Sequence, residues 1–188
     1  MSSPSQTGIV LYTMESLKSE GSWCGETHIQ KTLFLCQDIG LVPSKFKFIL
    51  YKHGPYSFEL SDHLQGLILD DLVCVRTRPP YGPTLEVSEE GHALAAEIQN
   101  NSSVASRITL MSKKLSKKNV AELEKLATAV YVNSKLGSHV PVEQRAEYLV
   151  SLKPHVSLDA ALAAFAEAKE IKEDFPLPFR LRPAIAPS

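Results

Sequence analysis

The stretch YKHGPYSFEL, residues 51–60, stands between a short apolar run and an amphipathic segment. Gly54 gives the backbone the freedom to turn, and Pro55 fixes φ where a helix start tolerates a missing N–H donor. Ser57 or Gly54 can cap the helix, and Glu59 suits the positive end of the helix dipole. We therefore interpret the stretch as a structural corner. The alternative is a recognition surface that includes Tyr51, His53 and Tyr56.

Upstream of this corner, the apolar pattern predicts two helices and a strand. Apolar residues recur at nearly helical spacing from Ile9 to Leu17, and Gly21 ends that helix. A second helix is predicted over residues 26–39. Residues 46–51 (FKFILY) alternate and are rich in aromatic and branched side chains, which predicts a short strand.

Downstream, apolar positions from Tyr56 to Ile68 recur every three or four residues, as in an amphipathic helix. Residues 72–77 (LVCVRT) and 84–87 (TLEV) flank the turn PPYGP and predict a β-hairpin. Ser88 then caps another helix. Three helices followed by a two-stranded wing predict a winged-helix-like domain over residues 8–100.

The second half of the chain is predicted to be helical. NNSS at residues 100–103 is the candidate linker, and Ser116 and Ser157 are predicted to cap helices on either side of a helix over 141–152. We expect residues 104–175 to form a helical extension packed on the first domain, and residues 1–7 and 176–188 to form tails. The overall class is mainly α with a small β-hairpin.

Composition excludes several classes of protein. The 188 residues are 44% hydrophobic and 22% charged with a net charge of −1, so the whole molecule has no long-range attraction to nucleic acid or anionic membrane. The sequence shows neither a signal peptide nor an apolar span, which predicts a cytoplasmic protein with no membrane partner. The three cysteines lack metal-ligand spacing, and we expect free thiols, no metal site and no cofactor.

A family resemblance supports the winged-helix prediction. Three consecutive motifs resemble those of the YwgA-like uncharacterised bacterial proteins. They are a K-x-x-x-L helix, the segment F-x-x-Y-x-x-G-P-Y-S, and a helix followed by Leu-Val. More distantly, they resemble the SocA-like Panacea antitoxin domain. The resemblance implies a winged-helix-like fold and a regulatory or toxin-neutralising role, without a catalytic set. The matching residues are Lys31, Phe48, Tyr51, Gly54, Pro55, Tyr56, Ser57, Leu72 and Val73.

The helix after the corner is acidic. Residues 56–71 contain no Lys or Arg, and carboxylates beside phosphates would weaken DNA binding. We therefore predict a non-enzymatic bacterial regulatory or antitoxin-like module that binds a protein, such as a basic toxin, or a second copy of itself as a homodimer. The candidate protein-binding residues are Tyr51, His53, Tyr56, Glu59, Asp62, Asp70 and Asp71.

The alternative is a winged-helix DNA-binding transcription regulator. Two arginines precede the PPYGP turn, and four lysines cluster where a helix is predicted to start. Such a cluster is most simply a solvated helix start, but cations there oppose the helix dipole, which slightly favours a partner. The candidate nucleic-acid-binding residues are Arg76, Arg78, Lys113, Lys114, Lys117 and Lys118.

An enzyme is the least favoured class. The sequence contains no HExxH, GxSxG, P-loop or GxGxxG motif. Catalysis needs a nucleophile, a base and an orienting group in one place, and no set of residues in the sequence indicates one. We predict no catalytic residues.

Overall fold

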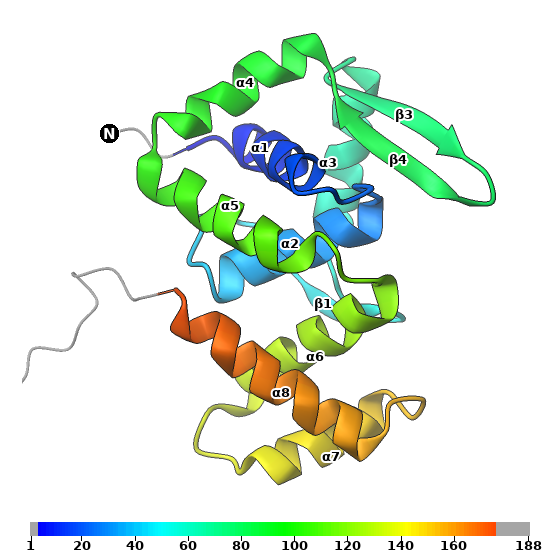
Figure 1. The fold of residues 1–188 in the computed structure, drawn as a ribbon, viewed down its shortest axis with the longest axis vertical. Helices are drawn as coiled ribbons and strands as arrows, with labels where there is room; N and C mark the ends of the chain where they lie inside the picture. Colours follow the sequence, from blue (N-terminus) through cyan, green and yellow to red (C-terminus); the bar gives the residue numbers. More distant parts are fainter. Residues whose placement is uncertain (1–3, 176–188) are drawn as a thin grey trace, which may run out of the picture.

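A computed structural model describes residues 4–175, without the side chains of residues 78, 81 and 102. This part of the chain is mainly helical and contains two antiparallel strand pairs, so the predicted class of mainly α with a small β-hairpin is confirmed (Figure 1). The elements in chain order are α1 (Gln6–Ser19), α2 (Glu26–Asp38), β1 (Ile49–Tyr51), β2 (Gly54–Tyr56), α3 (Phe58–Leu69), β3 (Val73–Arg78), β4 (Tyr81–Val87), α4 (Glu89–Gln99), α5 (Ser102–Leu115), α6 (Val120–Leu136), α7 (Val142–Leu152) and α8 (Leu158–Glu173).

Helix α1 lies at the centre of the upper half of the molecule, with α4 and α5 along it (Figure 1). Its apolar side chains Ile9, Leu11, Met14 and Leu17 are fully buried although they do not share one narrow stripe. A helix that is apolar around most of its circumference is stable only when other elements surround it. The first hydrophobic cluster is built around α1 and includes residues of α2, α3, α4 and α5.

The strands β3 and β4 form the predicted wing, which projects from the upper half (Figure 1). Their register runs from Val73 opposite Val87 to Arg78 opposite Tyr81. The Leu85 N–H donates to the Cys24 carbonyl oxygen at 3.1 Å, which attaches the wing to the loop between α1 and α2.

The corner at residues 51–60 differs from the sequence prediction. The predicted strand over 46–51 covers only 49–51, and it pairs with a second short strand, β2, across the turn. Pro55 therefore lies in β2 and not in the first turn of a helix. Ser57 is the cap, as expected, because its Oγ accepts the Leu60 N–H at 3.2 Å and α3 begins at Phe58.

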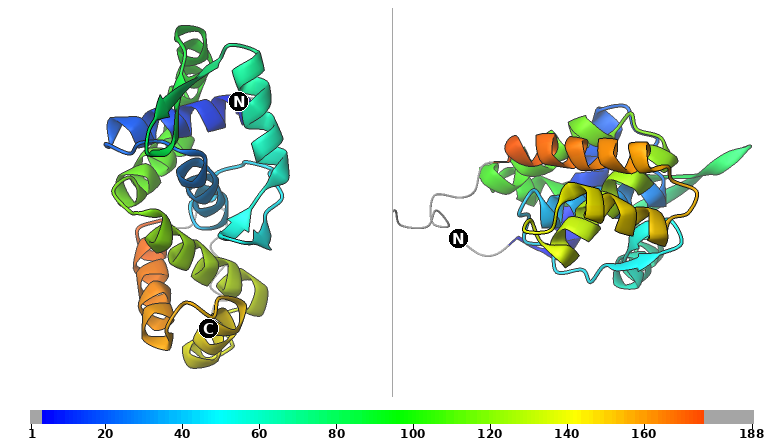
Figure 2. Two further views of the ribbon diagram at one scale, coloured as in Figure 1. Left: turned by 90° about the vertical axis from the view of Figure 1, so that its right-hand side faces the viewer. Right: turned by 90° about the horizontal axis from the view of Figure 1, so that it is seen from below.

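Helices α6, α7 and α8 form the lower half of the molecule (Figures 1 and 2). Helix α6 belongs to both halves, because Leu123 and Leu126 join the first cluster while Ala129 and Val132 join a second one with α7 and α8. Alanines in α8 let that helix approach α6 closely. The β1–β2 hairpin lies at the level where α6 joins the two halves, as Figure 2 shows.

The predicted linker at residues 100–103 is half helical, because residues 102 and 103 belong to α5. Asn101 caps α5, which begins at Ser102, and the side chains of Val104, Ile108 and Met111 lie in the first cluster. The division into residues 8–100 and 104–175 stays a prediction, and α5 packs with the first half. Of the predicted tails, residues 6 and 7 belong to α1, while residues 1–3 and 176–188 lie outside the described part.

At the junction between α5 and α6, two predictions were wrong: the Ser116 cap and the position of the lysine cluster at a helix start. Ser116 does not cap α6, because it is the residue that ends α5. Asn119 caps α6 in a capping box, in which Glu122 Oε2 accepts the Asn119 N–H at 2.8 Å and Asn119 Oδ1 accepts the Glu122 N–H at 3.0 Å. Lys113 and Lys114 therefore occupy the last turn of α5, where the helix dipole favours cations.

Residues 4–175 contain neither a candidate membrane span nor a candidate metal site. No helix there has the length and apolar character needed to cross a bilayer. No group of three or more His, Cys, Asp or Glu side chains in that range is placed to hold a metal ion.

Candidate functional site

The β1–β2 hairpin is held from behind by polar side chains of α2. The Gln30 amide bonds the Ser57 backbone twice, because its Nε2 donates to the carbonyl at 2.9 Å and its Oε1 accepts the N–H at 3.0 Å. Lys31 Nζ donates to the Pro55 carbonyl oxygen at 2.8 Å. Gln30 and Lys31 are both buried, so these bonds are shielded from water and position the hairpin firmly.

A second group of polar side chains holds the hairpin against the lower half. Gly54 has a φ of +83°, and a Cβ at this position would lie 3.0 Å from Thr128 Oγ1 on α6. Lys153, which follows α7, donates to the carbonyl oxygens of Tyr51 and Lys52 at the turn. Its Nζ also lies 2.9 Å from Glu124 Oε1. The turn is therefore fixed by residues from distant parts of the chain.

Glu124 and Lys153 form an ion pair at the centre of a buried polar network, and Lys31 belongs to this network because the charge of Glu124 acts on it. Burial lowers the pKa of Lys31 to about 8, although nearby Glu124 opposes this change. Burial raises the pKa of Glu124, but the hydrogen bond and charge of Lys153 outweigh it, so the pKa lies below its usual value. Removing Glu124 or Lys153 would leave the other charge buried and unpaired, which typically costs about 3–5 kcal/mol.

Two histidines flank this network at the surface. His53 Nδ1 lies 3.5 Å from Glu124 Oε2, and His155 Nε2 lies 3.7 Å from Glu124 Oε1. The side chains of His53 and His155 are 73% and 65% exposed. His53, predicted as a recognition residue, is therefore exposed but lies beside a structural carboxylate.

The front of the hairpin carries an exposed aromatic cluster. The ring centroids of Tyr51, Tyr56 and Phe58 are 5.1–5.9 Å apart in tilted and edge-to-face arrangements. Tyr51 is 45% exposed, Phe58 is 52% exposed, and Ile49 opposite Tyr56 is 49% exposed. We call Ile49, Tyr51, Tyr56 and Phe58 the hairpin face. It brings together two predicted residues, Tyr51 and Tyr56, with two that were not predicted.

Tyr56 anchors the hairpin face on α2. The Tyr56 hydroxyl donates to Glu26 Oε1 at 2.9 Å, and the same oxygen accepts a hydrogen bond from Ser61 at 3.0 Å. Partial burial and the carboxylate of Glu26 raise the pKa of Tyr56, so the phenol keeps its proton at neutral pH. An anchored tyrosine loses little conformational freedom when a partner covers it.

The predicted carboxylates divide into two groups. Glu59 and Asp62 are exposed on the first half of α3, beside the hairpin face. Glu59 Oε2 accepts the Lys47 N–H at 3.2 Å. Asp70 and Asp71 follow the far end of α3, which is about 18 Å from its start at 1.5 Å per residue. Only Glu59 and Asp62 lie near the aromatic cluster.

The predicted nucleic-acid residues are dispersed over several elements. Lys114 pairs with Asp174 and Lys118 pairs with Glu167, each at 2.5 Å, so both lysines attach α8 to the end of α5. Arg76 Nε lies 3.3 Å from Glu86 on the wing. Lys113 and Lys117 are exposed, and the side chain of Arg78 lies outside the described part.

The sequence interpretation missed several residues of this site. Phe58 was recognisable as an aromatic directly after a helix cap, next to the GPYS motif. Gln30 follows no visible pattern, since buried amides look like surface amides in a sequence. Glu124 and Lys153 carry no sequence signal because they meet the hairpin only after the lower half has folded against it.

No protein-family model matches this chain, and neither a curated protein nor a solved structure matches it.

Proposed function

We propose that this protein is a non-enzymatic, cytoplasmic regulatory module of the antitoxin-like type, which binds a protein partner through the hairpin face. The observation that carries the proposal is the aromatic cluster that Tyr51 and Tyr56 of the hairpin form with Phe58 at the start of α3, on a hairpin with buried polar support. Aromatic side chains that are rigid before binding are typical interaction hot spots.

The size of the hairpin face indicates how the partner would lie. A whole aromatic side chain has about 150–250 Å² of surface, and at their partial exposure Tyr51, Tyr56 and Phe58 together offer roughly 250 Å². A stable complex buries about 800 Å² on each partner. The partner must therefore also cover neighbouring surface, and the first half of α3 presents Glu59 and Asp62 there. A partner with an apolar pocket and a basic rim fits this chemistry, as a nucleic-acid-directed toxin would.

The test is an affinity capture, in which the tagged protein is mixed with a lysate of the organism that encodes it and the bound proteins are identified. Phe58→Ser and Tyr51→Ser each remove an exposed ring and should weaken capture at least tenfold, as expected for a hot spot. Leu69→Ser is the matched control, because Leu69 is an exposed apolar residue of the same helix with 83% exposure. The proposal fails if the ring variants capture the same proteins as the wild type.

The DNA-binding alternative is tested with the same preparation. Anisotropy of labelled random duplex is measured over a salt series with the wild type and with Lys113→Gln/Lys117→Gln, the two exposed lysines of the cluster. A steep salt dependence that the double variant abolishes would favour the transcription regulator instead. Weak binding that is insensitive to the substitutions agrees with the protein-binding proposal.

A further inference from the structure

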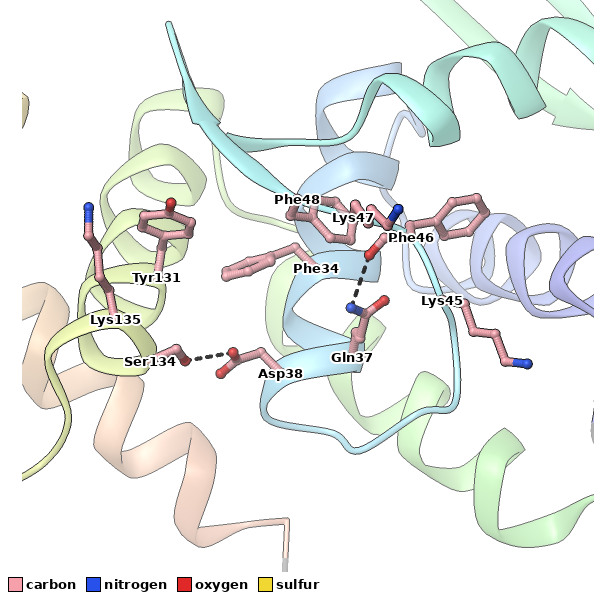
Figure 3. A pocket seen from close by; sticks show the side chains of 10 residues that line it. All are labelled: Phe34, Gln37, Asp38, Lys45, Phe46, Lys47, Phe48, Tyr131, Ser134 and Lys135. Atoms are coloured by element: carbon pink, nitrogen blue, oxygen red, sulfur yellow. Dashed lines mark hydrogen bonds between the residues drawn. The ribbon is translucent and has the colours of Figure 1, made fainter.

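A cleft of about 760 Å³ lies on the other side of the junction between the two halves. Helix α2 and the loop before β1 form one wall, and α6 forms the other (Figure 3). The helices meet where Ser134 Oγ donates to Asp38 Oδ2 at 2.6 Å. No residue of the hairpin face lines this cleft.

The walls of the cleft are aromatic. Phe34 and Phe48 pack edge to face with ring centroids 5.3 Å apart. Tyr131 projects from α6 on the opposite side, and Phe34 points toward it from α2 (Figure 3). Phe48 and Tyr131 are both half-buried, so each offers part of its ring to a ligand. A planar group between two such rings gains stacking and apolar contact.

Asp38 provides a polar acceptor in the cleft, at the point where α2 and α6 meet. Ser134 is its only hydrogen-bond partner among the described residues, and that bond uses one carboxylate oxygen. Burial raises the pKa of Asp38, while Ser134 and the charge of Lys172 oppose this change. A second donor from a ligand would complete the hydrogen bonding of a half-buried carboxylate.

The surroundings of Asp38 are basic, although the chain as a whole has a net charge of −1. Lys45, Lys47 and Lys135 line the cleft, and Asp38 is the sole acidic residue among its lining residues. Lys47 Nζ lies 3.9 Å from Glu59 in an exposed pair, and Lys135 Nζ lies over the Tyr148 ring, so both lysines are at the rim. A neighbouring cleft of about 690 Å³ shares Asp38 and Ser134. That second cleft adds a further set of cations, which are Arg145, Lys169 and Lys172.

One of these cations has incomplete hydrogen bonding. The Arg145 guanidinium stacks 5.4 Å from the Phe165 ring centroid, and its Nη1 donates to Asn133. Its Nε is buried and has no hydrogen-bond partner. Anionic groups bound near the Asp38–Ser134 bridge would therefore meet cations on both sides.

We propose that the cleft between α2 and α6 binds a nucleotide, with the base between Phe48 and Tyr131 and an exocyclic amino group donating to Asp38. The phosphates then lie at the basic rim, within reach of Lys135 or Lys47. The aromatic walls match the faces of a base, the acceptor matches its amino edge, and the surrounding cations match the phosphates. The same chemistry serves a free nucleotide or one base of a single strand, and the experiment separates these sources.

The test is calorimetric titration of the full chain with ATP, ITP, adenosine and a short oligo(dA). ATP should bind saturably and about tenfold more tightly than ITP, which presents a carbonyl to Asp38 in place of an amino group. Adenosine should bind more weakly than ATP because it lacks phosphates. Tighter binding of oligo(dA) than of ATP would identify a strand as the ligand, and the reverse would identify a free nucleotide.

Three variants locate the site. Asp38→Leu should abolish the preference for ATP over ITP, and Tyr131→Leu should weaken both ligands about tenfold through lost stacking. Lys135→Gln should weaken ATP and leave adenosine unchanged, whereas Lys125→Gln on the same helix is the matched control and should change neither. Melting curves establish that each variant folds. The proposal is overturned if neither ATP nor oligo(dA) binds, or if Asp38→Leu and Tyr131→Leu both bind them like the wild type.

Discussion

Replacing Gly54 by alanine tests how the β1–β2 hairpin is held against α6. A φ of +83° costs an alanine about 1–2 kcal/mol. The new Cβ would also lie 3.0 Å from Thr128 Oγ1 and 3.4 Å from the Glu124 carbonyl oxygen. Thr128 is fully buried and its hydroxyl donates to that carbonyl at 2.7 Å, so moving it adds about 1 kcal/mol. We expect Gly54→Ala to lower the free energy of unfolding by about 2–3 kcal/mol.

Gly21 provides the matched control. Its φ is +87°, but a Cβ there would meet nothing within 4 Å, so Gly21→Ala should show the backbone cost alone. Urea denaturation of both variants gives the two free energies of unfolding, and Gly54→Ala should be the more destabilised by about 1 kcal/mol. Adding Thr128→Ala should recover part of that difference. Equal losses for Gly54→Ala and Gly21→Ala would refute the close packing of the hairpin on α6.

Three further predictions concern charges and caps. Lys31→Met removes an amine whose pKa burial lowers to about 8 in the folded protein. As pH rises from about 8 to 10.5, the free energy of unfolding of the wild type should therefore increase by roughly 3 kcal/mol relative to that of the variant. A difference in urea denaturation that does not change with pH would contradict this. Asn119→Ala removes the capping box and should cost about 1 kcal/mol, or roughly 2–4 °C in melting temperature; an unchanged melting temperature would argue against the cap. Lys114→Gln and Lys118→Gln should each lower the free energy of unfolding by at most about 1 kcal/mol, because the ion pairs are partly exposed. These losses should shrink when denaturation is repeated in high salt. Losses that do not depend on salt would argue against ion pairs.

Local sequence signals predicted much of the fold. Ser57, Ser88 and Ser157 each cap a helix as expected, because a cap depends on residues close together in the chain. The wing was also predictable, since two β-prone runs flank a proline-rich turn. The turn itself is shorter than the predicted PPYGP, because residues 81–83 already belong to β4 and only Pro79 and Pro80 connect the strands. The start of α6 was placed wrongly at Ser116, although the Asn119–Glu122 spacing is that of a capping box and marks the observed start.

Contacts in the candidate site between residues far apart in the chain could not be predicted from local sequence patterns. The strand at residues 46–51 was predicted, but its three-residue partner β2 gives too little alternation to be recognised, so the hairpin was taken for a simple corner. Lys31 was noted as part of a family motif, but its contact with Pro55 depends on how α2 lies behind the hairpin. The pairing of Glu124 with Lys153 arises from tertiary packing, which no spacing in the sequence encodes.

Site-specific photo-crosslinking tests the central claim most directly. A photoreactive phenylalanine analogue replaces Phe58, which keeps an aromatic ring on the hairpin face, and in a parallel chain it replaces Leu69 at the other end of α3. We expect position 58 to give one discrete protein adduct in cells of the organism that encodes the protein, and position 69 to give none. The double substitution Glu59→Lys/Asp62→Lys should reduce the adduct from position 58. The absence of an adduct at position 58, or equal adducts from both positions, would contradict protein binding through the hairpin face.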